Sequence, residues 1–185
     1  MKLIFGCGYL GSCVAAAWRG AGDDVTIVTR SDMRSEKFAA DGFESLVADV
    51  TEPSTLENLP KAETVLFTVG FDRTAGQTIH QVYADGVRNV LDALPEKVAR
   101  FIYISTTGVY GPADGNWVDE QTPTNPQRDG GRASLAAENA ILSHGLANQA
   151  IILRLAGIYG PGRIPFLDQL RAGEPIGAPQ KGYLN

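Results

Sequence analysis

The sequence predicts an α/β fold, a doubly wound parallel sheet with helices on both faces. Two observations indicate this class. Short apolar runs rich in β-branched residues alternate with segments of helical character along most of the chain. The runs are also apolar on both sides, as strands are when helices cover both faces of a parallel sheet. Such strands are joined by right-handed βαβ crossovers.

Each element follows from a local signal. The strands are expected at the apolar runs 3–5, 25–29, 45–48, 64–69, 101–105 and 151–155. The helices are expected at 9–19, 33–40, a short turn after Pro53, 77–94, 132–146 and 166–171. Pro95 ends the long helix because proline cannot continue its hydrogen-bond ladder. A polar loop with several prolines and glycines spans residues 111–131.

Length and composition fit one globular domain. The chain has 185 residues, of which 44% are hydrophobic and 20% charged, and its net charge is −5. This acidic balance argues against a nucleic-acid surface, and no apolar run reaches membrane-spanning length. The two cysteines, Cys7 and Cys13, are interpreted as reduced, and a strand begins after one residue. A cytoplasmic protein without a signal peptide is therefore expected, and no metal-ligand spacing is found.

A glycine-rich turn follows the first strand and opens the first helix. Residues 6–11 read GCGYLG, a GxGxxG pattern. Gly6 permits the tight turn, Gly8 lets the backbone approach a pyrophosphate, and Gly11 lets the helix pack closely on the sheet. The first-turn N–H groups of that helix lack intrahelical acceptors, and the helix dipole favours an anion there. This context predicts a Rossmann dinucleotide-binding unit, with a purely structural turn as the alternative.

The end of the second strand bears on the choice of dinucleotide. In Rossmann units an acidic residue there binds the ribose 2′-hydroxyl of NAD, whereas arginine suits the 2′-phosphate of NADP. Arg30 occupies this place and Arg34 follows one helical turn later, so NADP is favoured over NAD. In the alternative, Arg30 is a solvated loop charge. Asp49 is expected near the adenine, or else serves only as a turn residue. The other residues expected at the cofactor are Tyr9, Leu10, Ser31, Val50, Val69 and Ser105.

Two later segments carry a family resemblance. Residues 103–111 read YISTTGVYG and residues 153–162 read LRLAGIYGPG. They resemble strands five and six of the extended short-chain dehydrogenases/reductases, the nucleotide-sugar epimerase/dehydratase group. Residues 86–91, GVRNVL, look like that group's helix after strand four, whereas the glycine loop is similar to an atypical branch with the GxGxxG spacing. The resemblance covers nearly the whole chain and implies NAD(P) as cofactor and a small-molecule substrate such as a nucleotide sugar.

The chain departs from the catalytic pattern that this resemblance implies. The family uses a Ser or Thr, a Tyr, and a Lys four residues after the Tyr, and the Tyr exchanges a proton while hydride moves to or from the nicotinamide. Thr106 stands at the Ser/Thr position, but Gly130 replaces the Tyr and Ser134 replaces the Lys. Glycine has no side chain, and serine has no charge that could lower a Tyr pKa. Tyr110 is the nearest other proton donor, or in the alternative a wall of the cleft.

Two further positions near this degenerate pattern draw attention. Tyr83 stands where the family often has a helix Asn, and Arg128 lies beside the missing Tyr. Arg128 could bind an anionic substrate, although an exposed loop role is the alternative. Two functions remain open: an NAD(P)-binding oxidoreductase or epimerase/dehydratase-like enzyme with a rearranged proton donor, and a non-catalytic dinucleotide-binding sensor or regulatory module.

The resemblance also suggests how the chain is organised. Residues 1–160 are expected to form the dinucleotide-binding Rossmann domain, and residues 161–185 the start of a C-terminal substrate lobe. Family members continue past this point, so the lobe looks truncated. A homodimer is a further expectation, because helices equivalent to 77–94 and 132–146 often form the dimer face in this family.

Overall fold

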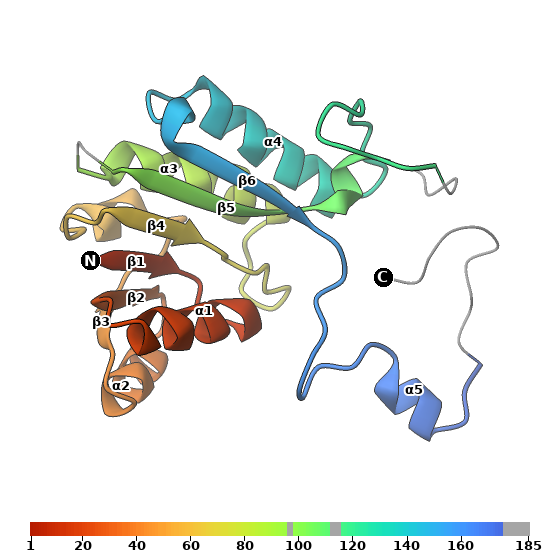
Figure 1. Ribbon diagram of the computed structural model, residues 1–185, viewed down its shortest axis with the longest axis horizontal. Helices are drawn as coiled ribbons and strands as arrows, with labels where there is room; N and C mark the ends of the chain where they lie inside the picture. Colours follow the sequence, from red (N-terminus) through yellow and green to blue (C-terminus); the bar gives the residue numbers. More distant parts are fainter. Residues whose placement is uncertain (96–97, 112–115, 176–185) are drawn as a thin grey trace.

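The computed structural model describes residues 1–95, 98–111 and 116–175. Within this part, six strands form one parallel sheet in the order β3-β2-β1-β4-β5-β6 (Figure 1). The strands are β1 (Lys2–Phe5), β2 (Val25–Thr29), β3 (Glu44–Val47), β4 (Thr64–Phe67), β5 (Arg100–Thr106) and β6 (Ala150–Leu155). The predicted doubly wound α/β class is confirmed.

Helices cover both faces of this sheet. The α-helices are α1 (Tyr9–Gly20), α2 (Asp32–Ala40), α3 (Gly86–Ala93), α4 (Asp129–Ser143) and α5 (Leu167–Arg171). Short helical turns are η1 (Pro53–Leu56), η2 (Gln81–Asp85), η3 (Thr107–Val109) and η4 (Ala147–Gln149). Helices α1 and α2 lie on one face, whereas α3 and α4 lie side by side on the other (Figure 1).

The central strands of the sheet are buried on both sides, as the apolar runs predicted, whereas the edge strands β3 and β6 are partly exposed. On β1, Leu3, Ile4 and Phe5 are fully buried. Successive side chains of a strand point to opposite faces. Leu3 and Phe5 therefore join the core beneath α3 and α4, whereas Ile4 joins a second core beneath α1. Continuous apolar strands are needed at the centre of the sheet, because β1, β2 and β4 are covered on both faces.

Three elements differ from the predicted ones by more than one residue. β4 ends at Phe67, before residue 69, because Val69 passes directly against Gly6. The helix expected at 77–94 contains a π-turn, η2, immediately before α3, and hydrophobic periodicity does not reveal such an inserted residue. α4 begins earlier than residue 132 and includes Gly131. A Cβ at Gly131 would lie 2.4 Å from the Gly108 carbonyl oxygen, so this glycine lets α4 pack closely against η3.

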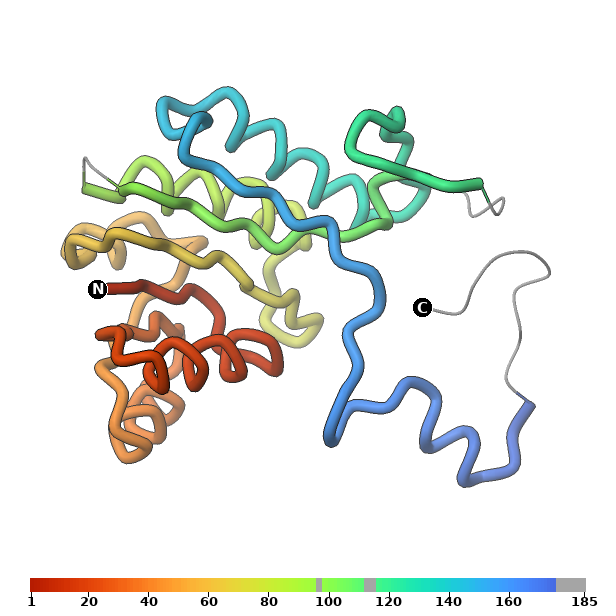
Figure 2. The backbone as a smooth tube through the Cα atoms, in the orientation of Figure 1, coloured from red at the N-terminus to blue at the C-terminus, as the bar shows by residue number. Residues whose placement is uncertain are grey.

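After β6 the chain leaves the sheet. Figure 2 shows the segment between β6 and α5 extending away from it, and none of the residues of α5 is buried. The expected C-terminal lobe corresponds to this arm as far as residue 175, and residues 176–185 lie outside the described residues. None of the described helices is both long and apolar enough to cross a membrane.

Candidate functional site

Two cavities lie along the carboxyl edge of the sheet. The strand order turns back between β1 and β4, and this switch point is where open α/β sheets bind ligands. The first cavity, about 310 Å³, is lined by the loops that follow β1, β2, β3 and β4. The second, about 530 Å³, is lined by the start of α1, the end of β5, the start of α4 and the segment after β6. Gly8, Val69 and Gly70 line both, so the cavities form one continuous groove.

The three positions of the turn carry glycine for different structural reasons. Gly6 has φ +83°, and a Cβ there would lie 2.6 Å from the Val69 Cα. A Cβ at Gly11 would lie 2.4 Å from the Gly6 carbonyl oxygen. Gly8 has φ −79° and ψ −150°, and a Cβ there would meet no atom within 4 Å. The fold therefore requires glycine at residues 6 and 11, whereas Gly8 leaves open space above the backbone.

This open space adjoins the start of α1. Gly8 is the N-cap residue of α1. Because glycine has no side chain, this residue offers no side-chain cap to the N–H groups of the first turn. The first N–H groups of a helix have no intrahelical acceptors, and the helix dipole favours an anion beside them. The surroundings of Gly8 thus fit a pyrophosphate, which needs both close backbone approach and N–H donors.

The first cavity is lined by two arginines and two aspartates. The Arg34 Nη2 donates a 2.5 Å hydrogen bond to the Cys7 carbonyl oxygen, which holds this guanidinium against the glycine turn. The Arg30 Nη2 lies 2.5 Å from the Asp72 Oδ2. The Asp49 carboxylate accepts hydrogen bonds from the backbone N–H and the hydroxyl of Thr51, at 2.9 and 2.8 Å. Both signs of charge therefore face this cavity.

The expected cofactor residues are distributed over the whole groove. Those that line the first cavity are Gly6, Gly8, Arg30, Arg34, Asp49, Val50 and Val69. Those that line the second are Gly8, Tyr9, Leu10, Val69 and Ser105. Ser31 lies outside both linings and caps α2, where its hydroxyl accepts a hydrogen bond from the Arg34 N–H. Gly11 is used for the packing of α1.

The second cavity contains the three positions that the family resemblance relates to catalysis. Thr106, Gly130 and Ser134 all line it. The Thr106 hydroxyl accepts a 3.0 Å hydrogen bond from the Gly108 N–H. A Cβ at Gly130 would meet only the tip of Ile79, at 3.6 Å, so a side chain at this position has room to start into the cavity. Packing around the Cβ position therefore does not require glycine at residue 130.

Two tyrosines line the same cavity near these positions. Tyr103 is buried, and burial raises the pKa of its phenol well above the usual range. The Tyr83 hydroxyl accepts a 3.3 Å hydrogen bond from the Phe71 N–H, and Tyr83 lies on the π-turn η2. Sequence reasoning missed Tyr103, although its place on β5, on the same face as Ser105, was a usable signal.

Tyr110 lies elsewhere. It lines a third cavity of about 480 Å³ rather than the one that holds Thr106. The Arg154 guanidinium lies 4.9 Å from the centre of the Tyr110 ring, a cation–π arrangement. The structure therefore separates the two residues that the sequence had grouped as candidates for proton transfer.

A buried ion pair lies between the second and third cavities. Glu138 on α4 is 1% exposed, and the Arg154 Nη2 and Nε lie 2.7 and 3.2 Å from its Oε2. The Ser105 hydroxyl donates a 2.5 Å hydrogen bond to the same carboxylate. Hydrogen bonding to Glu138 raises the pKa of Arg154. This cluster, which sequence reasoning also missed, fixes β5, β6 and α4 at the cavity wall.

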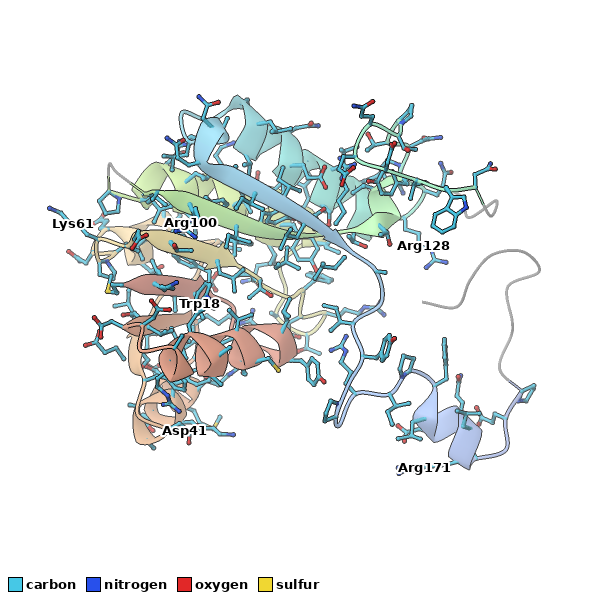
Figure 3. All side chains as sticks on the ribbon, viewed as in Figure 1. Trp18, Asp41, Lys61, Arg100, Arg128 and Arg171 are labelled. Atoms are coloured by element: carbon cyan, nitrogen blue, oxygen red, sulfur yellow. The ribbon has the colours of Figure 1, made fainter. Side chains whose placement is uncertain are left out.

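The charged side chains that line the second cavity are both arginines. Arg128 and Arg163 line it, and among the described residues no Asp or Glu does. The Arg163 Nε donates a 2.9 Å hydrogen bond to the Ile158 carbonyl oxygen, and its guanidinium lies 5.6 Å from the centre of the Tyr9 ring. Figure 3 shows Arg128 at the carboxyl edge of the sheet, whereas Lys61 and Arg100 lie at the opposite edge. The second cavity is thus positively charged in a chain of net charge −5.

Metal binding has no candidate site in the described part of the chain. No group of three or more His, Cys, Asp or Glu side chains is placed there to hold a metal ion.

Comparison with known proteins agrees with this geometry. Protein YeeZ of Escherichia coli K12 is 32% identical over 169 residues, which cover 88% of this chain and 60% of that protein. UDP-glucose 4-epimerase of Corynebacterium glutamicum is 29% identical over 182 residues, 86% of this chain and 53% of the enzyme. A short-chain dehydrogenase/reductase superfamily protein from Agrobacterium tumefaciens with bound NAD is 25% identical, with a TM-score of 0.69, over 83% of this chain and 48% of that one.

The chain thus spans 60% and 53% of the lengths of the two curated relatives. Residues 3–175 match the family described as NAD dependent epimerase/dehydratase. The matched residues include the glycine turn at residues 6–11 and the positions Thr106, Gly130 and Ser134. The chain belongs to the NAD-dependent epimerase/dehydratase family.

Proposed function

We propose that the chain binds a nicotinamide dinucleotide along the groove formed by the two cavities. The adenosine half lies in the first cavity, the pyrophosphate lies at Gly8, and the nicotinamide half lies in the second cavity. The observation that carries this proposal is the open space above Gly8, a glycine that neither packing nor backbone conformation requires. The bound NAD of the Agrobacterium tumefaciens neighbour supports the same class of cofactor.

NADP is the preferred dinucleotide in this proposal. Arg30 and Arg34 both line the adenosine cavity, and a guanidinium fork suits the ribose 2′-phosphate. Arg34 is already held against the glycine turn by its hydrogen bond to the Cys7 carbonyl oxygen. It is therefore placed to bind phosphate without losing much side-chain freedom.

The proposed activity is that of an oxidoreductase or epimerase/dehydratase-like enzyme with a rearranged proton donor. A bound nicotinamide supplies hydride transfer. Thr106 presents a hydroxyl to the second cavity and can hold the reacting oxygen of a substrate. Tyr83 is better placed than Tyr110 to carry the proton, because Tyr83 lines this cavity and Tyr110 lines another. The Glu138–Arg154 pair acts as a positioning element that holds Ser105 in the cavity wall.

The proposed substrate is anionic and of the nucleotide-sugar class. Arg128 and Arg163 offer two guanidinium groups in a cavity that is lined by no described acidic side chain. Such a cavity attracts a diphosphate, which arginines bind through charge-assisted hydrogen bonds. Similarity to UDP-glucose 4-epimerase over 86% of this chain supports this class.

A second candidate function is a non-catalytic dinucleotide sensor. It is favoured by Gly130 and Ser134, which replace the Tyr and Lys that the family resemblance implies and leave space in the cavity. In this function the groove binds the cofactor and reports its state to a partner, and Tyr83 and Thr106 have no chemical role.

One experiment separates the two functions. The purified chain is mixed with each oxidised or reduced dinucleotide and a panel of UDP- and dTDP-sugars, alcohols and carbonyl compounds, and nicotinamide absorbance and sugar products are followed. Turnover that is lost in Thr106→Val and Tyr83→Phe, and kept in the matched control Tyr110→Phe, supports the enzyme. Dinucleotide binding without turnover on the whole panel supports the sensor. Absence of any dinucleotide binding contradicts both.

A further inference from the structure

The loop after β4 contributes an acidic residue to the adenosine cavity. Asp72 lines this cavity, and its Oδ2 lies 2.5 Å from the Arg30 Nη2. Arg30 directly follows β2, whereas Asp72 comes from the loop after β4, far away in the sequence. The position where Rossmann units often have a carboxylate therefore holds an arginine that is paired with a carboxylate from another loop.

Asp72 is held in place by its own loop. Its Oδ1 accepts hydrogen bonds from the Thr74 N–H at 2.9 Å and from the Thr74 hydroxyl at 2.7 Å. The second oxygen, Oδ2, is left to face Arg30. Hydrogen bonds from Thr74, together with Arg30, lower the pKa of Asp72, so the carboxylate is charged at neutral pH.

The remaining charged groups at this cavity have hydrogen-bond partners other than Asp72. Asp49 is engaged by the N–H and hydroxyl of Thr51, and Arg34 donates to the Cys7 carbonyl oxygen. At the Arg30–Asp72 pair, the guanidinium and the carboxylate therefore have opposite effects on the binding of the group at the 2′ position of the ribose. A 2′-phosphate gains from Arg30 and is repelled by Asp72, whereas a 2′-hydroxyl can donate a hydrogen bond to Asp72.

We propose that Asp72 is the residue that limits the preference of this chain for NADP over NAD. The inference rests on the proposed function, since it assumes that the first cavity holds the adenosine ribose. Asp72 neutralises Arg30 and supplies the carboxylate that β2 lacks, so the chain accepts both dinucleotides. Removal of the Asp72 charge frees Arg30 for the 2′-phosphate and removes the acceptor for the 2′-hydroxyl.

The test compares the dissociation constants of NADPH and NADH in matched variants of the full chain. Asp72→Asn keeps an oxygen that can accept from Thr74 and removes the negative charge. The control Asp23→Asn makes the same change of net charge at the amino end of β1, where Asp23 lies 3.1 Å from Lys2. Loss of one exposed charge contact changes an equilibrium constant by up to about fivefold. Because the 2′-phosphate is a dianion, its contact with Asp72 has a larger effect. We therefore expect about a tenfold shift in the NADPH/NADH affinity ratio.

The expected result is a rise of about tenfold in that ratio for Asp72→Asn, a fall for Arg30→Gln, and no change for Asp23→Asn. If the wild-type chain binds both dinucleotides and the ratio in Asp72→Asn stays within about twofold of wild type, the inference is wrong and the proposed function stands. An equal gain in affinity for both dinucleotides also overturns it, because it would reflect net charge alone. If the wild-type chain binds neither, the proposed function itself fails.

Discussion

Replacement of Gly8 by alanine separates a requirement of the fold from a requirement of the ligand. The added Cβ would meet no protein atom within 4 Å, and φ is −79°, outside the left-handed region that favours glycine. Alanine is a poorer N-cap than glycine by up to about 1 kcal/mol. It recovers about 0.4–1 kcal/mol by restricting the unfolded chain. The free energy of unfolding should therefore change by less than about 1 kcal/mol, or about 2–4 °C in Tm for a chain of this size.

The same methyl group should strongly weaken dinucleotide binding. It would occupy the open space where a pyrophosphate approaches the start of α1 and would push the phosphate away from the N–H donors. Loss of one hydrogen bond to a charged group costs about 1.5–3 kcal/mol, which raises Kd about ten- to hundredfold.

The assay pairs thermal unfolding with NADPH titration for two variants. Gly11→Ala is the matched control, because its Cβ would lie 2.4 Å from the Gly6 carbonyl oxygen and 3.1 Å from the Thr68 Cγ2. Overpacking against backbone atoms falls at the upper end of the usual cost, about 3 kcal/mol, so Gly11→Ala should lower Tm by about 6 °C or more. The reasoning would be refuted by a Gly8→Ala variant that binds NADPH as tightly as wild type, or by one that unfolds as early as Gly11→Ala.

Three further predictions concern the Glu138–Arg154 ion pair, the buried Cys7 thiol and Arg128. Glu138→Ala should lower the free energy of unfolding by about 3 kcal/mol, because it leaves Arg154 without its buried partner, and the double change Glu138→Leu with Arg154→Met should cost much less in denaturant titrations. Burial raises the pKa of the Cys7 thiol above its ordinary value of 9.0, so the folded chain holds this proton more tightly and stability falls as the pH rises above about 9. Tm measured against pH should fall less steeply in Cys7→Ala than in wild type, and equal slopes would contradict this. Arg128→Ala should raise the Kd for UDP about three- to tenfold and should leave the Kd for NADPH unchanged, as judged by calorimetry.

The fold class and the positions of the strands could be predicted because they depend on local patterns. The apolar runs of β1 and β2, and the glycine turn that begins at Gly6, each carry their signal within a few residues. The π-turn at Gln81–Asp85 could not be predicted, because an inserted residue in a helix leaves no mark on hydrophobic periodicity. The early start of α4 was missed for a related reason: Gly131 is typical of a loop, yet here it allows close packing against Gly108.

The site was harder to predict because its parts come together only in the fold. Arg30 was named from its place at the end of β2, but its partner Asp72 comes from the loop after β4, and no sequence spacing links them. Tyr110 was grouped with Thr106 because the two are close in sequence, yet η3 lies between them and they line different cavities. Proximity in sequence at a strand end therefore does not decide which cavity a side chain enters.

Calorimetric titration of NADPH, and then of NADH, into the purified chain tests the central claim most directly. Gly8→Asp is the control, since its carboxylate would occupy and repel the pyrophosphate position. The account predicts saturable binding of one NADPH per chain, weaker binding of NADH, and loss of both in Gly8→Asp with Tm unchanged. Absence of binding in the wild-type chain, or equal binding in Gly8→Asp, would contradict the account.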